Sequence, residues 1–163
     1  MTQSRFTVEP LPSSSVTGPL SAAGVLLTDE HGRILMVSNP YREGLVLPGG
    51  GIEFDESPAQ AAEREVREEL GLVVCVTRLL AVHHRTDPFQ PAVTLYVFDT
   101  DPIPSNTPLV LQPGEITETF WLPPAEAIRR HAFRGQLRLE AALQARATGQ
   151  TLYLDDTHTL PFD

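Results

Sequence analysis

The feature of the sequence that most constrains the fold is a helix whose two ends are both marked, between Ser57 and Gly71. Ser57 suits the N-cap, because its hydroxyl can accept a hydrogen bond from a free amide of the first turn. Pro58 stands at the first helical position, where its missing N–H costs nothing. Gln60 completes a Ser-x-x-Gln capping box. Gly71 supplies the left-handed residue that ends such a helix.

The side chains of this helix separate onto two faces. At about 100° per residue, one face is an apolar stripe that consists of Ala59, Ala62, Val66 and Leu70. Glu65, Glu68 and Glu69 share another face at spacing i, i+3 and i+4, so their carboxylates meet over one turn. Such like-charge pairs cost roughly a few tenths of a kcal/mol each, which a divalent cation with oxygen ligands would offset. A solvated acidic face is the alternative interpretation.

The residues around the three glutamates favour a binding site. Gly49, Gly50 and Gly51 are expected to form a loop ahead of the helix, where backbone can approach a ligand closely. Arg64 lies next to the glutamates, and Glu56, just before the N-cap, is placed to pair with it. Such a pair would tie the loop to the helix.

Together these residues resemble the Nudix box, which reads Gly, five residues, Glu, seven residues, Arg-Glu-apolar-x-Glu-Glu-x-Gly-apolar. Every defined position is filled, by Gly50, Glu56, Arg64, Glu65, Val66, Glu68, Glu69, Gly71 and Leu72. The preceding Leu47-Pro48-Gly49 is similar to the usual lead-in, whereas Leu45 stands where many members have a tryptophan. The motif covers 23 of the 163 residues, and matches at this fixed spacing would rarely coincide by chance.

The resemblance implies hydrolysis of a nucleoside diphosphate linked to another group, X. In the family, Mg²⁺ or Mn²⁺ held by carboxylates acidifies water and neutralises phosphate oxygens. Carried over position by position, the metal ligands would be Glu65, Glu68, Glu69 and the carbonyl of Gly49. Arg64 would orient the cluster with Glu56 as its partner, and Gly50 would contact the substrate.

Further residues are candidates for catalysis and substrate binding. The general base differs among branches of the family, and Glu65 and Glu115 both remain candidates. Glu118 is the second choice for a glutamate that reaches the site from the later part of the chain. Arg42 and Arg85 are candidate phosphate contacts, since guanidinium suits phosphate, and a solvated charge is the alternative for Arg42.

The leading substrates are ADP-ribose or an ADP-sugar, and a nucleoside triphosphate. Pro88 lies at about the distance after the box where the ADP-ribose branch often has a proline, but the sequence does not decide between the two classes. One alternative function is a non-catalytic Nudix-fold nucleotide sensor, which usually lacks a metal glutamate. Another is an isomerase of an isoprenoid diphosphate, which would need an additional catalytic cysteine.

Composition excludes several classes of function. Cys75 is the only cysteine, so an internal disulfide is excluded and a reduced compartment is favoured; its apolar neighbours predict a buried thiol. All twelve basic residues are arginine, which excludes Schiff-base lysines and a Walker-type loop. A net charge of −9 argues against binding to nucleic acid polymers or anionic membranes. Without a signal peptide or a run of about 18 apolar residues, a soluble, cytoplasmic protein is expected.

The order of the expected elements is typical of an α/β fold with helices on both faces of a sheet. Strands are expected at Ala22–Leu27, Ile34–Val37, Leu45–Leu47, Val73–Val82, Ala92–Asp99, Glu115–Leu122 and Leu152–Leu154. After the first helix, further helices are expected at Ala125–His131 and Gln136–Ala147, and Leu137 should face inward. The resemblance makes the fold specific: a Nudix fold, with a mixed β-sheet between helices and the box as a loop–helix–loop at the cleft.

The domain organisation follows from the same pattern. Residues 1–19 are expected to be an extended arm, and residues 20–163 a single domain. Asp101–Gly114 is expected to be a long loop, and such loops are often lids or binding loops. A small-molecule nucleotide is the expected partner. Homodimers are frequent in the family, and the sequence does not fix the oligomeric state.

Overall fold

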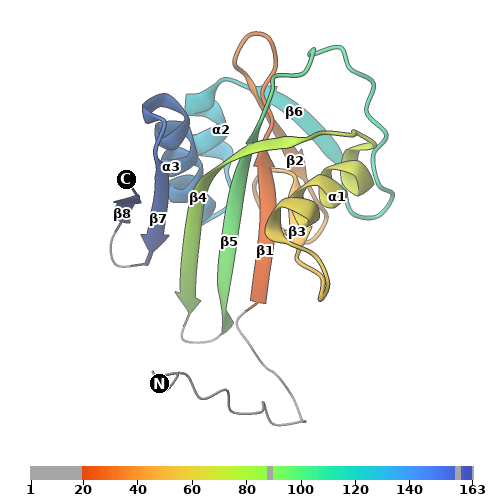
Figure 1. Ribbon diagram of the computed structural model, residues 1–163. Coiled ribbons are helices and arrows are strands. Elements are labelled where there is room, and N and C mark those ends of the chain that lie inside the picture. Colours follow the sequence, from red (N-terminus) through yellow and green to blue (C-terminus); the bar gives the residue numbers. More distant parts are fainter. Residues whose placement is uncertain (1–19, 88–89, 157–158, 163) are drawn as a thin grey trace, which may run out of the picture.

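The computed structural model describes residues 20–87, 90–156 and 159–162. The expected arm at residues 1–19 and Pro88 lie outside these ranges. Within them the chain forms a six-stranded sheet in the order β3-β1-β5-β4-β7-β8 and a two-stranded sheet of β2 and β6 (Figure 1). The strands are β1 (Leu20–Leu26), β2 (Ile34–Ser38), β3 (Gly49–Gly51), β4 (Val76–Asp87), β5 (Gln90–Thr100), β6 (Glu118–Leu122), β7 (Thr151–Asp155) and β8 (Thr159–Phe162).

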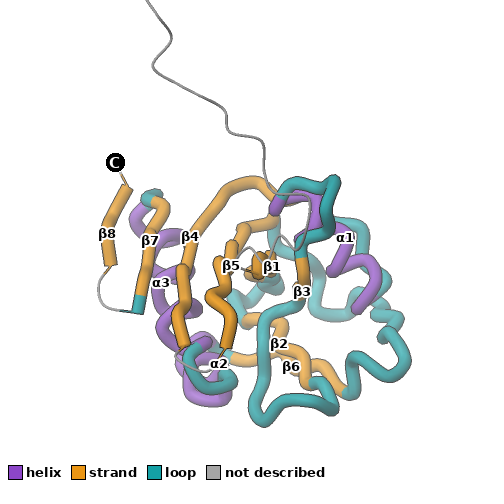
Figure 2. The backbone as a smooth tube through the Cα atoms, turned by 90° about the horizontal axis from the view of Figure 1, so that it is seen from below, coloured by secondary structure: helices purple, strands orange, loops and turns teal. Residues whose placement is uncertain are grey.

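The larger sheet is mixed and lies between helices. β1 runs parallel to β5 and β4 runs parallel to β7, while the other neighbours are antiparallel. The helices in the described ranges are α1 (Pro58–Leu70), α2 (Pro124–Arg130) and α3 (Gly135–Thr148). α1 covers one side of the sheet, and α2 and α3 cover the other (Figures 1 and 2). The predicted α/β sandwich is therefore confirmed. None of these helices combines the length and hydropathy that a bilayer-spanning segment requires.

The core consists of two apolar clusters, one on each side of β1 and β2. Val25 belongs to the cluster that contains Val66 of α1, whereas its neighbour Leu26 belongs to the cluster that contains Leu139 of α3. Successive residues of a strand point to opposite faces. The segments Val25–Leu26 of β1 and Ile34–Val37 of β2 are apolar on both faces because both of their faces are covered.

The ends of α1 are those that the sequence predicts. The Gln60 amide donates to Ser57 Oγ at 3.2 Å, and the Ser57 amide donates to Gln60 Oε1 at 2.9 Å, which closes the capping box. Gly71 has φ 68° and ψ 12°, and its N–H donates to the Arg67 carbonyl. Because these signals are local, they do not depend on the tertiary fold.

The predicted loop and the predicted strand before α1 are interchanged in the structure. Gly49–Gly51, expected to be a loop, pairs antiparallel with β1 as β3. Leu45–Leu47, expected to be a strand, contributes only isolated bridges. Gly49 lies so close to β1 that a Cβ would stand 2.2 Å from the Ala23 carbonyl oxygen, and its φ is 147°. Only glycine allows this approach of two backbones.

The prediction of a buried Cys75 is wrong. β4 begins at Val76, and the preceding extended segment alternates between a covered and an exposed side. Leu72, Val74 and Val76 pack in the α1-side cluster, while Val73 is 86% exposed and Cys75 is exposed. Only one face of this segment has a partner, so every second residue meets solvent.

The inward position predicted for Leu137 on α3 is also wrong. Leu137 is 47% exposed, whereas Leu139 is fully buried. Residues two apart on a helix lie about 200° apart, so both cannot face the same core. The buried side of α3 consists of Gly135, Leu139, Ala141, Ala142 and Ala145.

His83 and His84 lie within β4, which runs on to Asp87, and not at its end. As expected for neighbours on a strand, they have different surroundings. His83 is buried with Nε2 3.3 Å from Asp156 Oδ1, and His84 Nδ1 lies 3.1 Å from Thr94 Oγ1. The two rings therefore cannot share one metal ion.

A buried histidine makes the stability pH-dependent. His131, at the C-terminus of α2, is 5% exposed, and its pKa is lowered to about 4, first by burial and then by the charge of Arg138. The unfolded chain takes up this proton near the ordinary pKa of 6.5 and the folded chain does not. The contribution of His131 to the free energy of unfolding is therefore complete above pH 6.5. It falls by on the order of 3 kcal/mol as the pH decreases towards 4.

The check is urea unfolding between pH 4 and 8 for wild type, His131→Gln and, as a control, His31→Gln. The His131→Gln variant should lose part of the decline below pH 6.5. The His31→Gln variant should keep it, because the His31 side chain is 66% exposed. Equal declines in all three proteins would contradict the assignment.

Candidate functional site

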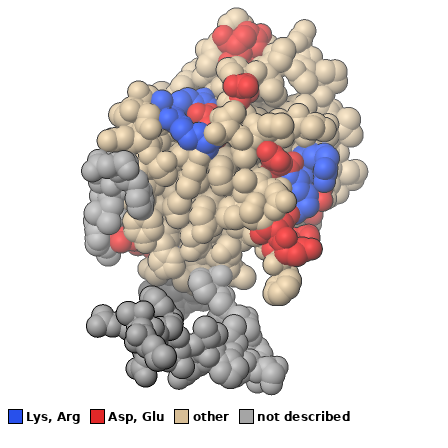
Figure 3. All heavy atoms as spheres, viewed as in Figure 1, with Lys and Arg blue, Asp and Glu red and all other residues tan. Residues whose placement is uncertain are grey.

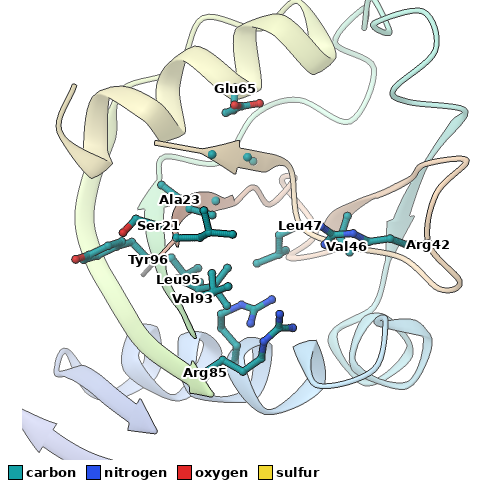
Figure 4. A pocket seen from close by; sticks show the side chains of 18 of the residues that line it. Ser21, Ala23, Arg42, Val46, Leu47, Glu65, Arg85, Val93, Leu95 and Tyr96 are labelled. Carbon is teal, nitrogen blue, oxygen red and sulfur yellow. The ribbon is translucent and has the colours of Figure 1, made fainter. Parts of the chain in front are cut away.

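A cavity of about 670 Å³ is lined by residues from many parts of the fold. β1, β3 and β5 form its floor, and its walls come from the segment 39–47, α1, β4, α3 and the loop before β6 (Figure 4). Predicted site residues in its lining are Gly49, Gly50, Glu65, Glu69, Glu115, Arg42 and Arg85. Those outside the lining are Glu56, Arg64 and Glu68, and Glu118 is on β6 opposite Ser38.

Arg64 connects the loop after β3 to the glutamates of α1. Its Nη2 lies 2.6 Å from Glu56 Oε1 and donates to the Gly51 carbonyl at 2.8 Å. Its Nη1 donates to Glu65 Oε1 and to Glu68 Oε2, both at 2.9 Å. Over α1, basic and acidic side chains lie side by side on the surface (Figure 3). One planar guanidinium therefore fixes two glutamates of the helix and one of the loop.

The hydrogen bonds from Arg64 also set the charge of its loop partner. They lower the pKa of Glu56 to about 2, with a further contribution from the backbone N–H of Glu53. Glu56 is therefore ionised at every pH at which the protein would work, and the Arg64–Glu56 ion pair persists.

Glu69 is the most deeply placed carboxylate of the site. It is 7% exposed, and its Oε2 accepts from the Gly49 amide at 2.9 Å. Its pKa is raised to about 8, first by burial and then by repulsion from Glu65, Glu115 and Glu68, against the lowering effect of the Gly49 amide. Burial also raises the pKa of Glu65, opposed by Arg64. A nearby cation would stabilise the ionised form of both carboxylates.

Gly50 makes room for Glu65. A Cβ on Gly50 would stand 2.5 Å from both Cδ and Oε1 of Glu65. By contrast, a Cβ on Gly51 would have no heavy atom within 4 Å. The glycine at position 50 therefore allows the carboxylate to lie directly against β3.

The long loop before β6 brings Glu115 to the site. Residues 101–117 contain no helix or strand. The loop predicted for Asp101–Gly114 is therefore present, but it extends to residue 117, and the strand predicted to begin at Glu115 begins at Glu118. The loop is bound to α1. The amides of Val110 and Gln112 donate to the carbonyls of Leu70 and Glu69 at 2.9 and 3.0 Å, which satisfies carbonyls at the end of the helix. Glu115 follows three residues after Gln112 and lines the cavity.

The donor set of the site fits a hard divalent cation. In the described part of the chain, no three acidic, histidine or cysteine side chains are grouped closely enough to hold a metal ion. Arg64 donates to Glu68 and to one oxygen of Glu65. The available donors are carboxylate oxygens, which Mg²⁺ and Mn²⁺ prefer. Glu69 is buried among like charges, an arrangement that a cation would stabilise.

A group of arginines lines the opposite side of the cavity. Figure 4 shows Glu65 on the side of α1, and Arg85 on the side of α3. Arg138 of α3 also lines the cavity, and sequence reasoning missed it. The available signal was its position, four residues before Ala142 and seven before Ala145, which places a charge on the apolar stripe of the helix.

Comparisons with known proteins agree with the motif and the fold. Residues 18–142 match the family model described as NUDIX domain. A MutT-like protein of Streptomyces ambofaciens is 31% identical over 153 residues, which cover 92% of this chain and 94% of that protein.

Two solved structures share the fold. A MutT protein from Methanosarcina mazei Go1 superposes with a TM-score of 0.66 at 20% identity, over 83% of this chain and 99% of that one. A UDP-X diphosphatase superposes with a TM-score of 0.68 at 25% identity, over 89% and 71%.

The Arg64 contacts can be tested with Arg64→Lys. Lysine keeps the charge but cannot reach the loop and both helix glutamates at once, so Glu65 and Glu68 lose their orientation. Mn²⁺ affinity, measured by calorimetry, should fall on the order of 10- to 100-fold. Arg67→Lys, at an exposed position of the same helix, is the control and should bind Mn²⁺ like wild type. Unchanged affinity in Arg64→Lys would argue against an orienting role.

The space at Gly50 can be tested with a matched pair of alanine variants. Gly50→Ala should displace the Glu65 carboxylate and remove most of the rise in melting temperature that Mn²⁺ causes. Gly51→Ala adds the same methyl group to open space and should retain the rise. Thermal unfolding with Mn²⁺ and with a chelator measures both variants, and equal behaviour would contradict the proposed contact.

Proposed function

The chain belongs to the Nudix hydrolase family, whose members are pyrophosphatases, and on that premise we propose that it hydrolyses a nucleoside diphosphate linked to another group, X. The observation that carries this proposal is the group of Glu65, Glu69 and Glu115 on one wall of a cavity that arginines line on its other side. A cation at the glutamates and guanidinium groups opposite them together complement a polyanionic substrate.

The roles proposed for the individual residues rest on the resemblance to the Nudix box and on where the residues lie. We assign the cation, Mg²⁺ or Mn²⁺, to Glu65, Glu68, Glu69 and the Gly49 carbonyl, where it would acidify water and neutralise phosphate oxygens. Arg64 holds Glu65 in place, and the Gly49 amide holds Glu69. These contacts fix the carboxylates before a substrate binds.

The general base is either Glu65 or Glu115, because both line the same cavity. Glu65 has one oxygen bound by Arg64, and the loop before β6 delivers Glu115 from the other end of α1. The pH dependence of kcat/KM in Glu65→Gln and Glu115→Gln distinguishes the two, since loss of the base removes the acidic limb of the profile. Glu118, outside the cavity, serves as the matched control for Glu115.

The substrate belongs to one of two proposed classes. ADP-ribose or an ADP-sugar is a nucleoside diphosphate with a sugar as X, and the similarity to a UDP-X diphosphatase supports this general type. A nucleoside triphosphate is the second class, and the MutT-like relative is compatible with it. A reduced, cytoplasmic setting fits a chain with a single, exposed cysteine. Cys75 does not line the cavity, so it does not supply the cysteine that an isomerase would need.

The test of the function is a panel of nucleotides with Mg²⁺ or Mn²⁺. The panel contains ADP-ribose, ADP-glucose, NADH, diadenosine polyphosphates and canonical and oxidised triphosphates, and a coupled phosphatase detects the products. Turnover of one class identifies the substrate. Absence of turnover across the panel, with a nucleotide still raising the melting temperature, would support a non-catalytic sensor and contradict the proposal.

Glu69→Gln provides the sharpest single variant. Turnover should fall by about a hundredfold or more, since loss of a ligand exceeds the effect of an outer-shell change. In chelator at neutral pH the variant should unfold at a higher temperature than wild type, because the glutamine removes a buried carboxyl group that ionises poorly there. Glu140→Gln, at an exposed position of α3, controls for net charge. Wild-type turnover in Glu69→Gln would refute the metal assignment.

A further inference from the structure

We propose that the cavity accepts nucleotides with a second phosphate group, remote from the pyrophosphate bond, and that Arg42, Arg85 and Arg138 bind this group. The inference rests on the proposed function, because it places the scissile bond at the carboxylates. It adds the class of substrate: a nucleoside diphosphate derivative that carries an additional phosphate elsewhere in the molecule.

The three arginines come from separate parts of the chain to one place. Arg42 lies in the segment after β2, Arg85 on β4 and Arg138 on α3, and all three line the cavity. The pKa of Arg138 is lowered to about 10, first by burial and then by the charges of Arg85 and Arg42. The fold therefore places like charges within mutual influence, which costs stability unless an anion binds between them.

No carboxylate among the described residues pairs with these arginines. Within the described residues, neither Arg42, Arg85 nor Arg138 forms an ion pair, although Arg33 pairs with Asp29 and Arg146 with Asp99. Such unpaired guanidinium groups in a cavity are suited to a phosphate.

The buried polar atoms of these arginines are also incompletely satisfied. Arg85 Nε is buried without a hydrogen-bond partner. Arg138 Nη1 has only a distant contact in the described residues, 3.5 Å from His83 Nδ1. Burial and then the charge of Arg138 lower the pKa of His83. A histidine ring carries no negative charge in either protonation state, so it does not compensate the charge of Arg138. An unpaired buried donor is costly, and an anion oxygen would satisfy it.

The arginines lie across the cavity from the carboxylates, so a phosphate bound by the arginines is remote from the pyrophosphate bond. Glu65 and Arg85 lie on opposite sides of the cavity, and apolar side chains of Leu47, Val93 and Leu95 line the space between (Figure 4). A cavity of about 670 Å³ has the size of sites that take a whole cofactor-sized ligand. The apolar middle suits sugar and base groups, and the two polar ends suit two separate phosphate groups.

The first measurement uses inorganic phosphate as the probe, with EDTA present so that no metal can bind it at the carboxylates. Phosphate should raise the melting temperature of wild type in a saturable way. Arg42→Gln and Arg85→Gln should lose the saturable part, and without phosphate Arg42→Gln should melt no lower than wild type, because it removes repulsion. Arg129→Gln changes an exposed arginine outside the cavity and is the control. It should keep the saturable rise in melting temperature. The non-saturable rise that phosphate causes in every variant measures its general stabilisation of folded proteins.

The second measurement compares ligands that differ by one remote phosphate. ADP-ribose 2′-phosphate with ADP-ribose, and coenzyme A with its 3′-dephospho form, are titrated calorimetrically in EDTA, where neither needs to be cleaved. In at least one pair the phosphorylated member should bind wild type and Arg129→Gln about tenfold to a hundredfold more tightly, as expected for charge-assisted hydrogen bonds. In Arg85→Gln the difference should disappear.

Two results would overturn the inference: an equal phosphate effect in Arg42→Gln and Arg129→Gln, or equal affinities within both ligand pairs. Neither measurement depends on turnover. A protein that binds the phosphorylated ligands through the arginines and hydrolyses nothing would therefore contradict the proposed hydrolysis and leave the phosphate site standing. A protein that hydrolyses nucleotides but shows no preference for the additional phosphate would support the proposed hydrolysis and contradict the phosphate site.

Discussion

The ion pair between Arg64 and Glu56 is the contact on which the candidate site depends. The same guanidinium binds Glu65, Glu68 and the Gly51 carbonyl, so it joins the loop to α1 and orients two of the three helix glutamates. Without it, Glu65 and Glu68 would lose the partner that offsets their mutual repulsion and would turn to solvent. Glu69 has a different support, because burial and the Gly49 amide hold it in place.

Each polar end of the cavity brings like charges together within the described part of the chain. At one end Glu69 is buried among like-charged carboxylates, and at the other Arg138 is close enough to Arg85 and Arg42 for its pKa to fall. The repulsion at each end destabilises the folded protein, and a bound ligand of opposite charge would offset this repulsion. The two halves come from opposite sides of the sheet, since α1 carries the carboxylates and α3 carries Arg138. The sandwich is therefore what brings a cation site and an anion site to one cavity.

Local and non-local features of this chain differ in how far the sequence predicts them. Ser57, Gln60 and Gly71 mark the ends of α1 correctly because each acts within one helical turn. The exposure of Cys75 could not be predicted, since it depends on which face of an extended segment another element covers. Arg138 was missed because its importance appears only when α3 packs beside β4, although a charge on an apolar stripe was a visible anomaly. Glu115 was chosen over Glu118 from the resemblance alone, and the hydrogen bonds of the preceding loop to α1 provide the physical reason for its place.

The most direct test of the carboxylate site is the ionisation of Glu69 itself, followed by ¹³C NMR of its side-chain carboxyl group as a function of pH, with the resonance assigned by Glu69→Gln. In the presence of a chelator the pKa of Glu69 should lie well above the ordinary 4.5, at about 8. Saturating Mg²⁺ should lower it strongly, because a bound cation stabilises the carboxylate. A pKa near 4.5 that does not respond to Mg²⁺ would contradict a buried carboxylate that binds the catalytic metal.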